Sequence, residues 1–80
     1  MDYYVITFNN INDALIAEDL VSVYGGTIIP VLSEISAGCG FAVRLTELEP
    51  AINILKSNIE FLEIYGVFGR GKDKVILRHT

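Results

Sequence analysis

Apolar and β-branched residues occur in five short runs along the chain. These runs predict strands over residues 3–8, 27–32, 41–45, 63–68 and 74–78. The first run is apolar on both of its faces, which is typical of a strand inside a sheet. Pro30 cannot donate a hydrogen bond to a neighbouring strand, so we expect the second run at an edge of the sheet.

A first helix is predicted between the first two runs. Its apolar residues recur at spacings of three and four, at Ala14, Ala17, Val21 and Tyr24. Asn10 or Asn12 could accept hydrogen bonds from the first helical N–H groups and so begin the helix. The glycines at positions 25 and 26 suit its end, because glycine adopts the left-handed conformation that closes a helix.

A second helix is predicted before the fourth run, with its apolar stripe at Leu48, Ile52 and Leu55. Thr46 and Glu49 have the spacing of a capping box, in which a threonine caps the helix and a glutamate follows three residues later. Pro50 would fall within the first turn, where a missing N–H costs least.

The predicted order is β-α-β-β-α-β followed by a short C-terminal strand. This order is that of the ferredoxin-like split βαβ fold, an α+β arrangement in which both helices cover one face of an antiparallel sheet. We expect a single domain over residues 1–80. The other face of the sheet would still carry apolar residues of the first strand beside Arg44, which predicts a homodimer formed through that open face.

Composition limits the classes of function. The chain has 80 residues, is 51% hydrophobic and carries a net charge of −4. Its basic residues are scattered, which argues against nucleic-acid binding, and no apolar run approaches the ~20 residues of a membrane helix. A single cysteine excludes an intrachain disulfide, and the first residues do not have the pattern of a secretory signal. We therefore expect a cytoplasmic protein.

Recognised catalytic patterns are scarce. His79 is the only histidine and lies one residue from the end, so no catalytic pair with a cysteine and no metal site is expected. The glycines at positions 66, 69 and 71 follow a strand, but no predicted helix follows them, so they do not form a dinucleotide-binding motif. No cofactor is predicted.

Cys39 is the candidate functional residue, and two interpretations of it are open. A lone cysteine is most often a buried, unreactive apolar side chain. However, Gly38 and Gly40 flank it, and glycines allow positive φ and leave backbone N–H groups free to converge on an anion. Such a group of donors would stabilise a thiolate and lower the pKa of the thiol.

Arg44 is a charged residue inside an otherwise apolar strand. It could cover the open face of the sheet with its aliphatic stem and place its charged end in solvent. Alternatively, it could supply positive charge near a thiolate or another anion, because it follows Cys39 by five residues.

Several segments together resemble the selenium/sulfur carrier protein-like family of small bacterial domains. They are the first strand, the beginning of the first helix, the Ile-Pro pair at positions 29 and 30, and above all residues 35–40, Ile-Ser-Ala-Gly-Cys-Gly, followed by Ala-Val-Arg. The resemblance implies that Cys39 carries sulfur or selenium as a persulfide or selenide. Gly38 and Gly40 would then supply backbone donors, Ser36 a hydroxyl, and Arg44 charge compensation.

The implied partner is a cysteine desulfurase or another selenium/sulfur-transfer protein, and the chain would be a co-substrate rather than an enzyme. The alternative is a non-enzymatic protein-binding or regulatory module that dimerises through its open sheet face. A thiol redox sensor is a third hypothesis. A carrier requires an accessible thiol with a pKa below the ~8.5 of free cysteine, whereas a module does not.

Overall fold

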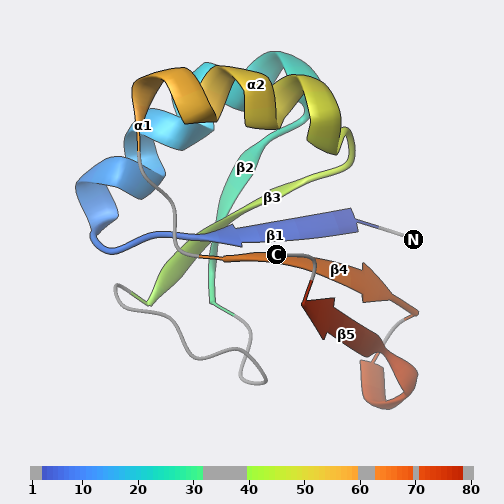
Figure 1. Cartoon of the computed structure of the whole chain (residues 1–80). Coiled ribbons are helices and arrows are strands. Elements are labelled where there is room, and N and C mark those ends of the chain that lie inside the picture. The colour runs from blue at the N-terminus through green and yellow to red at the C-terminus, as the bar shows by residue number, and fades with distance from the viewer. Residues whose placement is uncertain (1–2, 32–39, 60–62, 70, 79–80) are drawn as a thin grey trace.

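The computed structural model describes residues 3–31, 40–59, 63–69 and 71–78 of the chain. Two helices lie on one side of a sheet, as Figure 1 shows. The elements are β1 (Tyr3–Thr7), α1 (Ile11–Val21), the 3₁₀ helix η1 (Ser22–Tyr24), β2 (Thr27–Pro30), β3 (Phe41–Leu45), α2 (Leu48–Asn58), β4 (Ile64–Phe68), the 3₁₀ helix η2 (Gly71–Asp73) and β5 (Val75–Arg78).

The sheet has five strands in the order β2-β3-β1-β4-β5, and every pair of neighbours is antiparallel. The α+β class and the antiparallel sheet are therefore confirmed. β1 lies in the interior, as its apolar faces predicted, and β2 lies at an edge, as Pro30 predicted. β2 and β3 pair directly, with Pro30 opposite Phe41, so the connection between them closes a hairpin.

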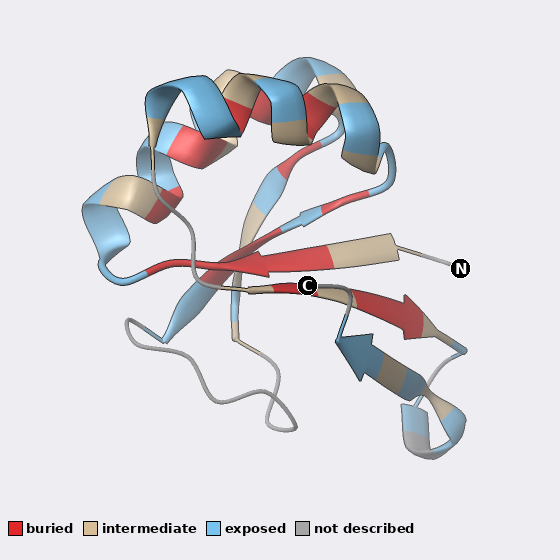
Figure 2. Ribbon diagram, viewed as in Figure 1, coloured by how far each residue is buried: buried red, intermediate tan, exposed pale blue. Residues whose placement is uncertain are grey.

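The main core fills the space between the helices and the sheet (Figure 2). Ala14 and Ala17 are fully buried on α1, and their small side chains let the helix approach the sheet closely. Leu55 is the large buried residue of α2. Alternate residues of the strands complete this core, since successive side chains of a strand point to opposite faces; they are Ile6, Val43, Leu45 and Ile64.

The opposite face of the sheet carries a second, smaller apolar cluster. Val5, Ala42 and Val67 are fully buried there, packed against the half-buried side chains of Tyr3, Ile29, Val31, Tyr65 and Ile76. The exposed large apolar residues of the described chain lie elsewhere: they are Ile11, Leu15, Ile16, Val23, Phe41, Val75 and Leu77. The homodimer through the open face stays a prediction, and the exposed apolar surface that we can describe belongs to α1, η1, β3 and β5.

The ends of α1 form as the sequence predicts. The backbone N–H of Asp13 donates to Oδ1 of Asn10 at 2.9 Å, so Asn10 is the N-cap. Gly25 has a φ of 78°, in the left-handed region, and closes the 3₁₀ turn that follows α1. Gly26 N–H then donates to the carbonyl of Val21 at 3.0 Å.

The capping box predicted at Thr46 is wrong. Glu47 is the N-cap residue of α2, and among the described residues its side chain makes no capping hydrogen bond. Pro50 explains the shift. A cap at Thr46 would need the N–H of the residue four positions later for the first helical hydrogen bond, and proline has none.

Candidate functional site

The candidate site lies on the connection between β2 and β3. At its base, Val31 N–H donates to the carbonyl of Gly40 at 2.9 Å, which continues the hairpin one pair beyond Pro30 and Phe41. Gly40 has a φ of 79°, a conformation that favours glycine. Among the described residues, no atom lies within 4 Å of the position that a Cβ at Gly40 would occupy. The described part of the chain therefore leaves room beside Gly40.

Three of the predicted site residues, Ser36, Gly38 and Cys39, lie outside the described residues. Gly40 and Arg44 are described, and both belong to the strand side of the connection. The sequence analysis noted that the glycines beside the cysteine allow a positive φ, and Gly40 has one.

Arg44 lies near the opposite end of β3 from Gly40. It pairs with Val5 and Thr27, and its guanidinium carbon lies 4.5 Å from the centre of the Tyr3 ring. This is a cation–π contact on the open face. Arg44 is four positions along the extended strand from Gly40, which corresponds to roughly 13 Å between their Cα atoms. Charge compensation by Arg44 at Cys39 stays a prediction.

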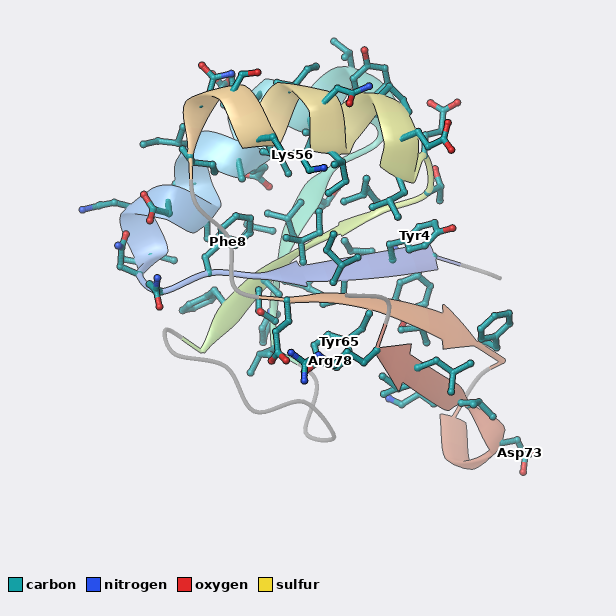
Figure 3. All side chains as sticks on the ribbon, viewed as in Figure 1. Tyr4, Phe8, Lys56, Tyr65, Asp73 and Arg78 are labelled. Atoms are coloured by element: carbon teal, nitrogen blue, oxygen red, sulfur yellow. The ribbon has the colours of Figure 1, made fainter. Side chains whose placement is uncertain are left out.

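A polar cluster that the sequence analysis did not identify lies on the same face, around Tyr65 and Arg78 (Figure 3). The Glu63 carboxylate accepts a hydrogen bond from the Tyr65 hydroxyl at 2.8 Å and pairs with Arg78 at 2.9 Å. Thr7 is fully buried, and its hydroxyl accepts from the Glu63 N–H at 3.1 Å. Because Thr7 also pairs with Ala42 of β3, Glu63 and Gly40 lie roughly 12 Å apart by strand geometry.

This cluster changes the chemistry of Tyr65. The hydrogen bond to Glu63 raises the pKa of the Tyr65 phenol above its ordinary value, because it stabilises the protonated form. Burial and the negative charge of Glu63 raise the pKa further, while the positive charge of Arg78 opposes them. Tyr65 is therefore a hydrogen-bond donor at neutral pH rather than a nucleophile.

The sequence gives little indication of this cluster. Glu63 looks like a solvated residue between a helix and a strand, yet its side chain is only 24% exposed. It precedes Tyr65 by two residues, the spacing that places side chains on one face of a strand. Arg78 comes from the last strand, and only the strand order brings it beside Tyr65.

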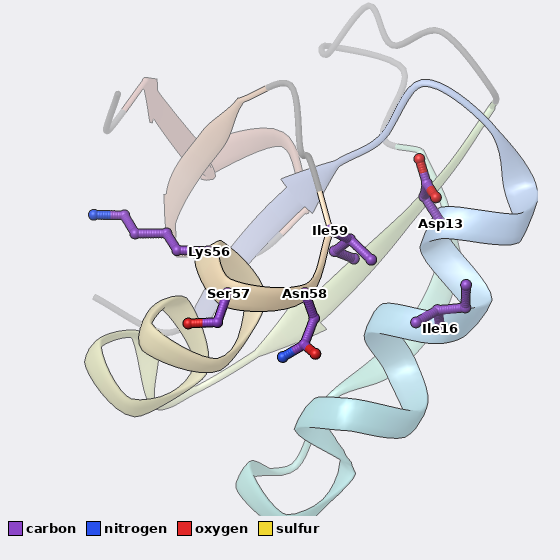
Figure 4. Close-up of a pocket in the computed structure, with 6 residues that line it drawn as sticks. All are labelled: Asp13, Ile16, Lys56, Ser57, Asn58 and Ile59. Carbon is purple, nitrogen blue, oxygen red and sulfur yellow. The ribbon is translucent and has the colours of Figure 1, made fainter.

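A shallow groove of about 590 Å³ lies between α1 and α2 (Figure 4). Three of its polar side chains already make local hydrogen bonds. The Asp13 carboxylate accepts from Asn10, while the Ser57 hydroxyl and the Asn58 amide donate to carbonyls of their own helix. Gly40 and Arg44, the two predicted site residues that the structure describes, do not line this groove.

Two further observations concern the described part of the chain. No group of three or more His, Cys, Asp or Glu residues lies close enough there to hold a metal ion. None of the helices described here is long and apolar enough to cross a membrane.

Comparison with known proteins gives one match. The model of a family described as "Putative Se/S carrier protein-like" matches residues 3–66. No curated protein and no solved structure matches the chain. The matched region spans β1 to the middle of β4 and includes the connection that holds Cys39, whereas β5 lies beyond it.

Proposed function

The chain belongs to the Se/S carrier protein-like family, and we propose that it carries a sulfane sulfur or selenium atom on Cys39. The observation that carries this proposal is that the matched residues include the only cysteine of the chain. Sulfur and selenium are carried on a thiolate, and this chain offers one thiol for that purpose.

The proposed loading step conserves atoms and electrons. The Cys39 thiolate attacks the terminal sulfur of a persulfide on a donor such as a cysteine desulfurase. The sulfur–sulfur bond of the donor breaks, the donor thiolate leaves with the electron pair, and a persulfide forms on Cys39. Attack by an acceptor nucleophile on the same terminal sulfur releases the Cys39 thiolate again. The protein acts as a co-substrate in both steps.

The residues around Cys39 suit this role. The positive φ of Gly40 supports this role, as does the lack of described atoms within 4 Å of its Cβ position, because a donor protein needs access to the neighbouring residue. We propose that backbone N–H groups at Gly38 and Gly40 and the hydroxyl of Ser36 stabilise the anionic sulfur, with Arg44 adding positive charge on the same hairpin. A reducing compartment, the cytoplasm, would keep this thiol free.

We also propose that the fold is a split βαβ fold of the ferredoxin-like kind with one added strand. The proposal is supported by the order β2-β3-β1-β4 with antiparallel neighbours, in which β1 and β3 are central. β5 then extends the sheet beyond β4.

Intact-mass measurement tests the carrier function. After incubation with a cysteine desulfurase and free cysteine, the protein should gain the mass of one sulfur atom, and a reductant should remove it. Cys39→Ser is the matched control, because it keeps the size of the side chain and removes the thiol. A gain of the same mass by Cys39→Ser would refute the assignment, as would a thiol that alkylating reagents reach only in the unfolded protein.

A further inference from the structure

β5 is the outermost strand on its side of the sheet and presents apolar side chains to solvent. Val75 is 51% exposed and Leu77 is 55% exposed. Both point to the helix side of the sheet, because they pair with Phe68 and Gly66, which alternate with Val67 of the open-face cluster. The two helices lie over the other strands, as Figure 1 shows, so these side chains have no helix above them in the described chain.

The hydrogen-bonding pattern fixes which backbone groups of β5 point outward. Thr7 N–H donates to the carbonyl of Glu63, so the odd-numbered residues of β4 face β1 and the even-numbered ones face β5. Val75 and Leu77 lie opposite even-numbered residues and therefore bond to β4. The N–H and C=O of Ile76 consequently point to the outer edge, where the structure describes no further strand.

The other edge of the sheet is closed to such pairing. By the same alternation, Ile28 and Pro30 are the residues of β2 whose backbone nitrogens point outward. Ile28 N–H donates to the Glu18 carboxylate at 2.7 Å, and Pro30 has no N–H. Natural proteins block edge strands in this way to prevent unwanted association.

We propose that β5 pairs with β5 of a second copy of this chain, in antiparallel orientation about a two-fold axis through Ile76. In this register the two Ile76 residues exchange both of their outward hydrogen bonds. Val75 of each copy then lies opposite Leu77 of the other, so four exposed apolar side chains form one cluster on the helix side. Two five-stranded sheets become one continuous sheet.

The proposed interface is small, and it joins only two copies of the chain. A four-residue strand with two exposed apolar side chains buries much less than a standard interface, so we expect a dissociation constant in the micromolar range or above. Lys74 lies opposite Arg78 of the second copy in this register, and the ion pair of Arg78 with Glu63 offsets part of that repulsion. With β2 blocked, the pairing stops at two copies.

The proposal is independent of the carrier function. β5 lies outside the residues that match the family, and the strands that bear the β2–β3 connection stay exposed to a donor in the dimer.

Sedimentation equilibrium of the full chain, at protein concentrations up to the millimolar range, tests the proposal. The Cys39→Ser background excludes association through a disulfide. We expect a reversible monomer–dimer equilibrium, and Leu77→Lys should weaken it roughly tenfold or more because it places a charge inside the apolar cluster. Leu15→Lys is the matched control: Leu15 is 48% exposed on α1, and this variant should dimerise like the parent.

Cysteine cross-linking tests the register. In the same background, Val75→Cys and Leu77→Cys chains should form a disulfide-linked dimer when mixed and oxidised, and much less when each is oxidised alone. This pair also decides the case if Leu77→Lys fails to fold. A protein that stays monomeric at all concentrations would overturn the proposal. A dimer lost in Leu15→Lys but not in Leu77→Lys would overturn it too, and would assign association to α1.

Discussion

A glutamate binds the strand at each edge of the sheet, but Glu18 binds a backbone group of its strand and Glu63 binds a side chain. Glu18 binds the backbone of β2 and occupies the one outward N–H that Pro30 leaves. Glu63 binds the Arg78 side chain of β5, on the open face, and does not bind the outward backbone N–H of Ile76. An edge strand is therefore protected by what binds its backbone, not by how firmly its side chains are held.

The two edge strands also differ in whether they lie within the residues that match the family. β2 leads into the connection that bears Cys39, and it lies within the matched residues. A blocked edge there keeps another copy from pairing beside the candidate site. β5 follows the matched residues, and its edge is the one opposite to β2.

The glycine turn between α1 and β2 places the Ile28 N–H against Glu18, and a substitution in this turn should have the largest effect on stability. A Cβ at Gly26 would overlap Cγ2 of Val21 and lie 2.9 Å from the Val21 carbonyl oxygen. The side chain can move, but the carbonyl oxygen belongs to the end of α1. Gly26→Ala should therefore lower the free energy of unfolding by roughly 3 kcal/mol, as measured by urea denaturation.

Gly71→Ala is the matched control in the connection that leads to β5. Gly71 has a φ of 58°, and no described atom lies within 4 Å of its Cβ position. Its substitution should cost only about 1 kcal/mol, from the left-handed backbone conformation. Equal losses in the two variants would mean that the close contact at Gly26 relaxes freely.

Removing the carboxylate that blocks β2 should have a smaller effect on stability. Glu18→Ala leaves the half-buried N–H of Ile28 without its charged acceptor, and the free energy of unfolding should fall by about 2 kcal/mol. Glu18→Gln keeps an acceptor oxygen at nearly the same place, so it should lose less than half of that. If the two variants lose the same amount, the hydrogen bond is not the source of the stabilisation.

Glu18→Ala combined with Pro30→Val would then give β2 an unblocked edge. β2 of one copy could pair with β5 of the next, and a contact between two different surfaces repeats without closing. Light scattering should show assemblies larger than a dimer in this variant and none in Glu18→Ala alone, where Pro30 remains.

Much of the fold could be predicted from local patterns. Alternating and continuous apolar runs located the strands, and Pro30 placed β2 at an edge. The start of α2 could not be read from the capping pattern alone, because Pro50 removes the N–H that a cap at Thr46 requires. The blocked edge was also beyond sequence reasoning, since Glu18 reaches Ile28 only after the glycine turn brings β2 against α1.

For the candidate site, local backbone features could be predicted from the sequence, whereas contacts between distant residues could not. A positive φ beside the cysteine followed from the glycines, because few other residues adopt that conformation, and Gly40 has it. Arg44 could be placed on the open face from its position in the strand, but not over the Tyr3 ring, which belongs to a strand far away in the sequence. The Glu63 cluster depends on the order of β1, β4 and β5, which no local pattern encodes.

The smallest expected effect is the stabilisation that comes from the hydrogen bond between Tyr65 and Glu63, and this stabilisation depends on pH. The pKa of Tyr65 is raised in the folded protein, chiefly by its hydrogen bond to Glu63, so the folded state binds the phenolic proton more tightly than the unfolded state. The stabilisation is therefore fully present below the unfolded pKa of about 10, and it is lost as the pH rises through the higher folded pKa.

Tyr65→Phe should cost about 1 kcal/mol or less at neutral pH, because the pair is partly exposed to solvent. The difference between the parent and Tyr65→Phe should shrink above about pH 10 in urea denaturation, and Glu63→Gln should reduce the same pH dependence. A difference that stays constant across this range would show that packing of the ring, rather than its hydroxyl, connects β4 to the edge strand.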